Sequence, residues 1–545
     1  MKCCKRLSVF ISAALLILTS AVGCSRDTSS DLVMSQTEYE EWKKNKLESE
    51  EELVQDEEAL DLIGDETDIN VMLWERGDNE ISSTDNNKLT DWIKKQVKKS
   101  YNVKVNYVLV QRSNSNAAIE ELVNNNEAPD IIFTYSQELF YKLADAGKLR
   151  PLNDLYDKYG SAIQEYCGAA QCGVETVEKR RYAVMGQRGT ETPKQVQYIR
   201  KDWLEQLGLP VPENKKQLED YLHKVKEAGL GTPWAMSGRK DTEKMYLNFV
   251  GSYVPLETAR KAYIYSDGYI VAAPEAYEGL KQLNEWYNEG LINSDFYEDE
   301  SEERYSQIVS SAKAGFILDD LTATWDDFER YYTDSSEDNC YVAVQCFDLP
   351  DGGYRNPFES KYGLFIMIPK STSEEKAIAC IKYLNWLAMP ENAVRVLYTP
   401  EYKKDDLGIP VGCTKENADK LGYPYHTEDY ELVNVDFEWS NDYEKISESM
   451  YRAQDNKWAT ADWYKRFYEV NQIGKYRYLV YGSVPPAQLE YGAELQTGLI
   501  EFVYNCIKAS THDFDTVYYE GMDTLNKKGL KKVLDARAEY YDEVN

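Results

Sequence analysis

From residue 69 onward, short apolar runs alternate with amphipathic stretches, and this alternation restricts the possible folds more than any other feature of the chain. The runs 69–74, 103–110 and 130–135 are rich in apolar and β-branched residues, as buried strands are. Between the first two runs, Leu89 and Ile93 lie one helical turn apart, so a helix is expected there. The resulting β-α-β-α-β order predicts an α/β fold with a parallel, doubly wound sheet.

Later segments show the same apolar runs and amphipathic stretches, and the chain is too long for a single hydrophobic core. Helical spacing dominates residues 200–300 and the region from about 443, and further strands are expected at 314–320, 341–347 and 363–369. A chain of 545 residues exceeds the size at which a single hydrophobic core stops growing. We therefore expect two lobes with a ligand cleft between them, because open α/β sheets bind ligands beyond the carboxyl ends of their strands.

The N-terminal segment has the composition of an export signal. Lys2, Lys5 and Arg6 precede the apolar residues 7–23, a run too short for a permanent membrane span. The small residues just before Cys24 resemble the lipobox of bacterial lipoproteins, in which the cysteine is lipidated and becomes the new N-terminus. The sequence also allows an ordinary secretory signal that is cut nearby, with Cys24 incidental.

These features divide the chain into five expected parts. The region after Cys24 is rich in Glu and Asp and poor in apolar residues, so it cannot bury a core and is expected to act as a tether. The expected parts are a signal peptide (1–23), a lipidated cysteine with an acidic tether (24–68), the N-terminal part of lobe 1 (69–200), the N-terminal part of lobe 2 (201–345), and the remaining segments of both lobes with the C-terminal helices (346–545).

The balance of charge excludes one class of partner. The chain has 62 basic and 94 acidic residues, a formal charge of −32. A field of that sign repels phosphate backbones, so no nucleic-acid partner is expected. No stretch after Cys24 is apolar enough to cross a bilayer, so contact with a membrane is expected through the N-terminal lipid only.

Cysteine and histidine usage gives no support for a metal or a cofactor. Seven cysteines lie beyond Cys24, and Cys167 with Cys172 and Cys340 with Cys346 are close enough in sequence for local disulfides. Buried thiols fit the same sequence equally well. There is no CxxC pair and only three histidines occur, which is unfavourable for zinc. No P-loop or GxGxxG is present, so no nucleotide cofactor is expected.

Five segments, taken in order, resemble one protein family. They are "APDIIFTY" (128–135), "YIRKDWLEQLGLPVPENKKQLEDYL" (198–222), "LKQLNEWYNEGLINSDF" (280–296), "KAGFILDDLTATW" (313–325) and "YEGMDTLNKKGLKKVLDARAEYYDEV" (519–544). Together they look like the extracellular solute-binding proteins, family 1, of bacterial ABC importers. The resemblance runs over nearly all of residues 69–545.

The resemblance implies a fold, a function and partners. It implies a two-lobed, periplasmic-binding-protein-like fold (type II) with a helical C-terminal region, which closes on a carbohydrate, an oligosaccharide being favoured. It also implies a monomer that is lipid-anchored at the extracellular face of the cell membrane and delivers its cargo to permease subunits. Some relatives carry a DPDGNG calcium loop in the second lobe; the corresponding stretch here, 227–238, lacks it, so no structural calcium is expected there.

A carbohydrate site needs an aromatic platform for the C–H face of the sugar and polar side chains for its hydroxyls. The chain has 44 Tyr and 11 Trp, so candidates are chosen by their position relative to the expected strands and turns. Residues that follow expected strands or lie in Gly-rich turns are the strongest candidates. The candidate ligand-binding residues are Trp74, Glu75, Arg76, Tyr135, Ser136, Trp234, Asp319, Asp320, Trp325, Tyr354, Arg355 and Trp439.

Three other functions remain open on the sequence alone. No G-x-S-x-G elbow accompanies His223, His426 or His512, so a serine hydrolase is not supported and no catalytic residue is assigned. A glycan hydrolase or lyase needs only two suitably spaced carboxylates, which the many acidic residues could supply. An oligopeptide-binding lipoprotein and a surface adhesin or sensor partner are the remaining alternatives.

Overall fold

The computed structural model describes most of the chain from residue 65 to the C-terminus, and this part belongs to one compact unit, Leu62–Asn545. The described residues are 65–545 without 76–83, 113, 168–173, 178–179, 188–192, 241, 321–323, 336–339, 359–361, 412–419, 425–426, 434, 436–441, 455–457 and 480–483. The expected signal peptide, Cys24, the tether, Arg76 and Trp439 lie outside the described residues.

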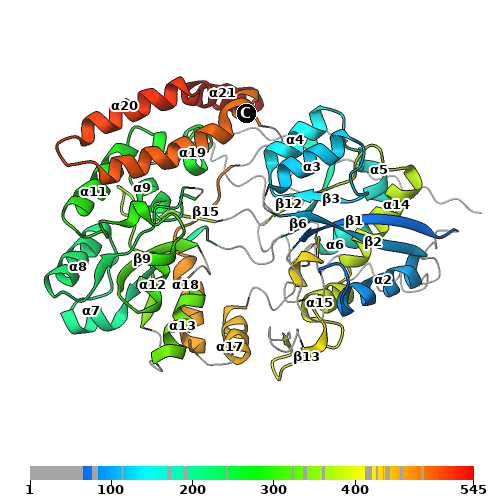
Figure 1. Cartoon of the computed structure of the whole chain (residues 1–545), viewed down its shortest axis with the longest axis horizontal. Helices are drawn as coiled ribbons and strands as arrows, with labels where there is room; N and C mark the ends of the chain where they lie inside the picture. The colour runs from blue at the N-terminus through cyan, green and yellow to red at the C-terminus, as the bar shows by residue number, and fades with distance from the viewer. Residues whose placement is uncertain are drawn as a thin grey trace, which may run out of the picture. The chain divides into compact units, whose positions relative to one another are not determined.

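Two separate hydrophobic cores divide this unit, which has the two-lobed α/β fold expected from the sequence. The core of lobe 1 draws on residues between 69 and 185, on residues between 364 and 435, and on Val484. The core of lobe 2 draws on residues between 196 and 347 and between 458 and 533. In Figure 1 each lobe therefore mixes colours from distant parts of the chain, blue with yellow in lobe 1 and green with orange and red in lobe 2.

Lobe 1 is built on the β-α-β-α-β unit that the sequence predicts. Strands β1 (Thr67–Glu75) and β2 (Val103–Gln111) pair in parallel, and Val71 bridges in parallel to Ile131, just before β3 (Ile132–Thr134). Helix α2 (Lys88–Tyr101) connects β1 to β2 and starts at a capping box, in which the Asn87 side chain accepts from the backbone N–H of Thr90. The sheet continues with antiparallel pairs, because β12 (Tyr362–Met367) returns from far along the chain between β3 and β6 (Ala183–Gln187).

Lobe 2 holds a four-stranded mixed sheet in the order β10-β7-β9-β8. Its strands are β7 (Gln195–Arg200), β8 (Thr232–Trp234), β9 (Ala314–Asp320) and β10 (Tyr341–Val344). Strands β8 and β9 are parallel, whereas β7 is antiparallel to both β9 and β10. The carboxyl ends of β8 and β9 therefore share one edge of the sheet.

Helices complete both lobes. Lobe 1 and the segments around it also contain α3 (Ser115–Asn124), α4 (Gln137–Asp145), α5 (Asn153–Tyr159), α6 (Ser161–Tyr166), β4 (Thr176–Val177), β5 (Arg180–Arg181), α14 (Glu374–Leu387), α15 (Pro390–Tyr398), β13 (Lys403–Lys404), β14 (Pro410–Val411) and η4 (Thr427–Asp429). Lobe 2 adds α7 (Lys201–Leu207), α8 (Lys215–Glu227), α9 (Leu247–Gly251), α10 (Ala259–Ile264), η2 (Asp267–Ala272), α11 (Ala276–Asn288), η3 (Phe296–Glu298), α12 (Glu303–Ser310), α13 (Trp325–Ser335), α17 (Tyr443–Ala453) and α18 (Ala461–Asn471).

The C-terminal region is helical, as expected. Helices α19 (Pro486–Lys508), α20 (Phe514–Lys527) and α21 (Leu530–Val544) pack on lobe 2, where α19 lies against α11 and α21 against α10 (Figure 1). Within the described residues, no helix combines the length and the apolar character that crossing a bilayer requires.

The chain passes between the two cores through segments that lie side by side. We call residues 193–195, 355–358 and 474–478 the crossing ribbon. Its strands β11 (Asn356–Pro357) and β15 (Lys475–Tyr476) pair in parallel, and the backbone N–H of Lys194 donates to the carbonyl of Pro357 at 2.8 Å. The N–H of Phe358 donates to the carbonyl of Tyr476 at 2.8 Å.

One of the two local disulfides allowed by the sequence does not form. Cys346 is a buried free thiol whose sulfur lies 3.1 Å from Oε1 of Gln197. The pairing of Cys340 with Cys346 is therefore wrong, because Cys346 packs inside the lobe 2 core as part of the β7 contacts. Cys172 lies outside the described residues, so its pairing with Cys167 stays a prediction.

Candidate ligand-binding site

The crossing ribbon brings cations and aromatic rings together beside lobe 2. Lys194 forms an ion pair with Asp267, and its Nζ lies 5.9 Å from the centre of the Tyr478 ring. The Arg355 guanidinium lies 5.8 Å from the centre of the Tyr476 ring. The rings of Tyr476 and Tyr478 are 5.3 Å apart and nearly perpendicular. Aromatic faces and charged hydrogen-bonding groups, the two components of a sugar site, thus occur side by side.

Asp267 is held in an uncommon backbone conformation at this place. Its φ is +53°, in the left-handed region that non-glycine residues rarely adopt, and its side chain is 53% exposed. Arg537 of α21 holds the preceding turn, since its Nε donates to the carbonyl of Tyr263 at 3.2 Å and its guanidinium also contacts Ser266. Strained residues that their surroundings hold in place are concentrated at functional sites.

The electrostatic surroundings keep Asp267 ionised. Desolvation by the neighbouring groups acts to raise the pKa of Asp267, but the charge and the hydrogen bond of Lys194, with the charge of Arg537, hold it below its usual value. Burial raises the pKa of the Tyr476 and Tyr478 hydroxyls, with Arg355 acting in the opposite direction. The site therefore offers a carboxylate that accepts hydrogen bonds and neutral hydroxyls that can donate them.

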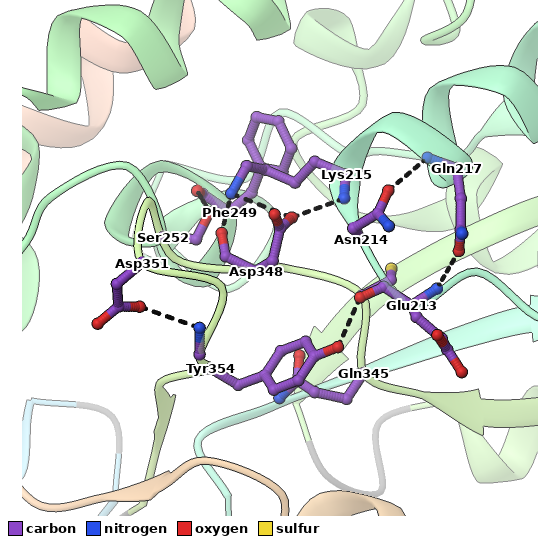
Figure 2. A network of polar contacts seen from close by, with 12 residues as sticks. Glu213, Asn214, Lys215, Gln217, Phe249, Ser252, Gln345, Asp348, Asp351 and Tyr354 are labelled. Carbon is purple, nitrogen blue, oxygen red and sulfur yellow. Dashed lines mark hydrogen bonds and ion pairs between the residues drawn. The ribbon is translucent and has the colours of Figure 1, made fainter.

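A polar network fixes the turn that carries Tyr354 and Arg355 (Figure 2). The backbone N–H of Lys215 donates to Oδ1 of Asp348 at 2.8 Å, and the Tyr354 hydroxyl donates to the carbonyl of Glu213 at 2.6 Å. Asp348 and Tyr354 also form an antiparallel bridge across the turn. Burial lowers the pKa of Lys215, although Asp348 acts to raise it. The turn is therefore tied to the start of α8 at two points, which restricts the position of Arg355.

The expected residues at the strand ends of lobe 2 have different environments. Trp234 is fully buried (0% exposed) and packs against Phe316 at 4.9 Å between ring centres, so its ring belongs to the core. Asp319 is 1% exposed and is ion-paired with Lys244 at 2.8 Å. Asp320, the last residue of β9, is exposed.

Trp325 is half-buried in an aromatic cluster of lobe 2. Its Nε1–H donates to the Tyr198 hydroxyl at 2.9 Å, and its ring packs 5.2 Å from that of Phe467. These contacts fix the ring while leaving part of it accessible. Trp325 and Asp320 are thus the two expected residues near the end of β9 that keep exposed surface.

The expected residues of lobe 1 follow β1 and β3. Trp74 is buried and packs edge-on against Phe133 at 5.0 Å, whereas Glu75, at the end of β1, is exposed. Tyr135 is 49% exposed, and Ser136 caps α4 by accepting from the N–H of Leu139 at 3.2 Å. Because β1 and the segment before β3 run in parallel, Glu75 and Tyr135 follow the same edge of the sheet.

Sequence reasoning proposed Arg355 for the site and missed four of its neighbours. Lys194 and Asp267 are 73 residues apart, and only the fold brings them together. The alternation of cations and tyrosines in "KYRY" (475–478) was a visible local signal for Tyr476 and Tyr478. In the described part of the chain, no three His, Cys, Asp or Glu side chains gather closely enough to hold a metal ion.

Three solved structures share this fold. The alginate-binding protein AlgQ2, in a structure without calcium ion, has a TM-score of 0.60 and 17% identity, with 88% of this chain and 98% of that chain covered. The substrate-binding protein FusA of the Streptococcus pneumoniae ABC transporter, in complex with kestose, has a TM-score of 0.58 and 15% identity, covering 88% and 99%. An HMO-binding, ABC-transporter-associated solute-binding protein from Bifidobacterium longum infantis has a TM-score of 0.59 and 14% identity, also covering 88% and 99%.

The sequence itself places the chain in a family. No curated protein sequence matches the chain. The family model for bacterial extracellular solute-binding proteins matches residues 82–394, which is more than half of the chain. This match includes the lobe 2 sheet, Lys194, Asp267 and Arg355. The chain belongs to the bacterial extracellular solute-binding protein family.

Proposed function

We propose that this protein captures an oligosaccharide outside the cell and delivers it to the permease subunits of an ABC importer. One observation carries the proposal: the crossing ribbon presents the perpendicular pair Tyr476 and Tyr478 between the cation of Arg355 and the ion pair of Lys194 with Asp267. Tyrosine rings suit the C–H face of a sugar, and fixed carboxylates and cations suit its hydroxyls. The names of two structural neighbours, which mention alginate and kestose, support the same class of ligand.

The proposed mechanism is closure of the lobes about the crossing ribbon. A ligand that contacts both lobes stabilises the closed state more than the open state, and so shifts the population toward closure. Lobe 2 would contribute Asp320 and Trp325 beside the ribbon residues, and lobe 1 would contribute Glu75, Tyr135 and Ser136, which follow its parallel strands. Closure creates the surface that the permease recognises.

We further propose that Cys24 carries a lipid that anchors the protein at the outer face of the cell membrane. Lipobox-like residues before Cys24 and the acidic segment after it support this anchor. Cells that express the Cys24→Ala variant should release the protein into the medium, whereas the wild-type protein stays with the membrane fraction. Equal retention of the two proteins would overturn the anchor.

Calorimetric titration with a panel of oligosaccharides and oligopeptides tests the binding function. We expect at least one oligosaccharide to bind without being cleaved. Tyr476→Ala should weaken that binding by about fivefold, given that stacking of this kind contributes roughly 1 kcal/mol. Tyr519→Ala is the matched control, because Tyr519 is 64% exposed on α20.

Three outcomes would overturn the proposal. Release of a shortened glycan in chromatography of the titrated mixture would identify a hydrolase or lyase. Binding of oligopeptides alone would identify a peptide receptor. A panel in which nothing binds would leave an adhesin or sensor partner as the better explanation.

A further inference from the structure

We propose that Arg355 binds an anionic substituent, a carboxylate or a sulfate, so that the cargo of this protein is a negatively charged oligosaccharide. This inference rests on the proposed function, since it names the ligand class of the same site. It starts from the partners that Arg355 has in the structure.

Arg355 is half-buried and has no anionic partner among the described residues. Its guanidinium donates one hydrogen bond, to the carbonyl of Gly251 in α9, and otherwise faces the ring of Tyr476. A guanidinium has five N–H donors, so most of the hydrogen-bonding capacity of Arg355 is unused by the protein. None of its other nitrogens is both buried and without a partner, so they are accessible to solvent and to a ligand.

Other arginines of lobe 2 show what is usual in this chain. Arg200 pairs with Asp202, Arg260 with Asp542 through both carboxylate oxygens, and Arg304 with Asp295. Pairing is expected when 94 acidic residues face 62 basic ones. Among the described residues Arg537 also lacks a carboxylate partner, but its guanidinium donates to Tyr263, Ser266 and Gln488, whereas that of Arg355 has a single acceptor.

The nearby carboxylates are committed to other groups. Asp267 forms an ion pair with Lys194, and the charge of Arg537 also acts to lower its pKa. Oδ1 of Asp351 accepts from the backbone N–H of Gly353 at 2.9 Å, within its own turn. Neither carboxylate forms an ion pair with Arg355 in the described part of the chain, although the charge of Asp351 acts on it, so an anion brought by the ligand would find the guanidinium unpaired.

The position of Arg355 suits planar, two-point recognition. The bond to Gly251 holds one end of the guanidinium, and the network around Asp348 and Tyr354 fixes the backbone just before it. A guanidinium with a fixed position loses little freedom when it binds a carboxylate or sulfate through two parallel hydrogen bonds. Desolvation lowers the pKa of Arg355, and the nearby Tyr478, Tyr476 and Asp351 offset this only in part.

The test compares three trisaccharides that differ in charge. Titrations use trigalacturonic acid, its carboxyl-reduced neutral counterpart and a sulfated form of that counterpart. We expect at least one charged form to bind more tightly than the neutral one, and Arg355→Gln to weaken that form by about 30-fold or more, the range for truncating one partner of a desolvated charge pair. Arg355→Lys should recover only part of the affinity for a carboxylate, because lysine lacks the planar fork.

Two controls distinguish a loss of anion binding from a loss of the fold. Arg260→Gln removes an arginine of the same lobe that pairs with Asp542 on the surface, and it should leave all three affinities unchanged. Thermal unfolding of each variant checks that the fold is intact. Tighter binding of the uronate identifies a carboxylate as the recognised anion, and tighter binding of the sulfated form identifies a sulfate.

Three results would overturn the inference while the proposed function stands. The first is tighter binding of the neutral trisaccharide, and the second is an equal loss of neutral and charged binding in Arg355→Gln. The third is binding of another neutral glycan when none of the three trisaccharides binds. If no glycan of any charge binds, the proposed function is wrong and this inference with it.

Discussion

Each lobe buries several carboxyl groups, and one from each lobe, Asp319 and Glu431, have opposite surroundings. In lobe 2, Asp319 accepts from the Tyr305 hydroxyl at 2.7 Å and pairs with Lys244 at 2.8 Å. In lobe 1, Glu431 is 6% exposed, and neither of its carboxyl oxygens has a well-formed hydrogen bond. The backbone N–H of Val435 acts to lower the pKa of Glu431, but burial dominates and raises it well above its usual value.

Asp319 and Glu431 therefore differ in how far their surroundings offset the effect of burial on the pKa. Burial raises the pKa of Asp319 as well, but Lys244 and Tyr305 act against that rise, so this carboxyl group belongs to a polar network around the end of β9. For Glu431 only the backbone N–H of Val435 acts against burial, so folding favours the protonated form of this carboxyl group. Asp319 is thus held by a cation and a hydroxyl beside the candidate site, whereas Glu431 is buried without a side-chain partner among the described residues.

The largest expected effect comes from breaking the lobe 2 pair. Lys244→Met leaves the Asp319 carboxylate buried without its cation, and removing one partner of a buried pair costs about 3–5 kcal/mol of unfolding free energy. Denaturant titration at neutral pH measures this loss. Lys201→Met is the control, because Lys201 and Glu205 form an exposed pair at 3.9 Å and its loss should cost less than about 0.5 kcal/mol. Similar losses in the two variants would contradict the contrast between the lobes.

A smaller effect with a distinctive pH dependence is expected from Glu431. Because its pKa is raised by folding, the folded state holds the proton more tightly than the unfolded state, so stability falls as the pH rises from the unfolded value toward the folded one. Glu431→Gln keeps the neutral form, and should be more stable than wild type at pH 8 by about 1–3 kcal/mol, since each tenfold difference in proton affinity between the two states is equivalent to roughly 1.4 kcal/mol.

The measurement for Glu431 is a series of urea titrations between pH 5 and pH 8. The wild-type protein should lose stability across this range, and Glu431→Gln should lose less. Glu539→Gln, which changes an exposed residue of α21, should follow the wild-type slope. Parallel slopes for wild type and Glu431→Gln would show that Glu431 is ionised in the folded protein.

The smallest effect compares two helix caps, one from each lobe. Asn87 caps α2 through the N–H groups of Leu89 and Thr90, and its amide also donates to the Tyr430 hydroxyl at 3.1 Å, next to Glu431. Asn214 caps α8 through a single N–H. We expect Asn87→Ala to cost about 1–2 kcal/mol and Asn214→Ala about 0.5–1 kcal/mol. Denaturant titrations measure the two losses of unfolding free energy. Equal losses for Asn214→Ala and Asn87→Ala would mean that the hydrogen bond of Asn87 to Tyr430 adds no stability.

Local patterns predicted the strands well and the site only in part. The run 69–74 became β1, and the run 314–320 coincides with β9, because apolar, β-branched segments fold as strands wherever they are buried. The sequence could not show that Trp234 packs into the core. Both faces of the lobe 2 sheet are buried, so the position of Trp234 at the end of a strand does not predict whether its ring is exposed. Asp267 and Lys194 meet only through the fold, so no local pattern near either residue indicates the other.

The contact of α21 with the turn before Asp267 affects when the candidate site is formed during folding. Arg537 lies 274 residues beyond Tyr263, the residue whose carbonyl accepts its hydrogen bond, so a helix far along the chain secures this turn. The left-handed conformation of Asp267 therefore depends on long-range packing, and the pair of Asp267 with Lys194 is held in place only where α21 has folded onto lobe 2.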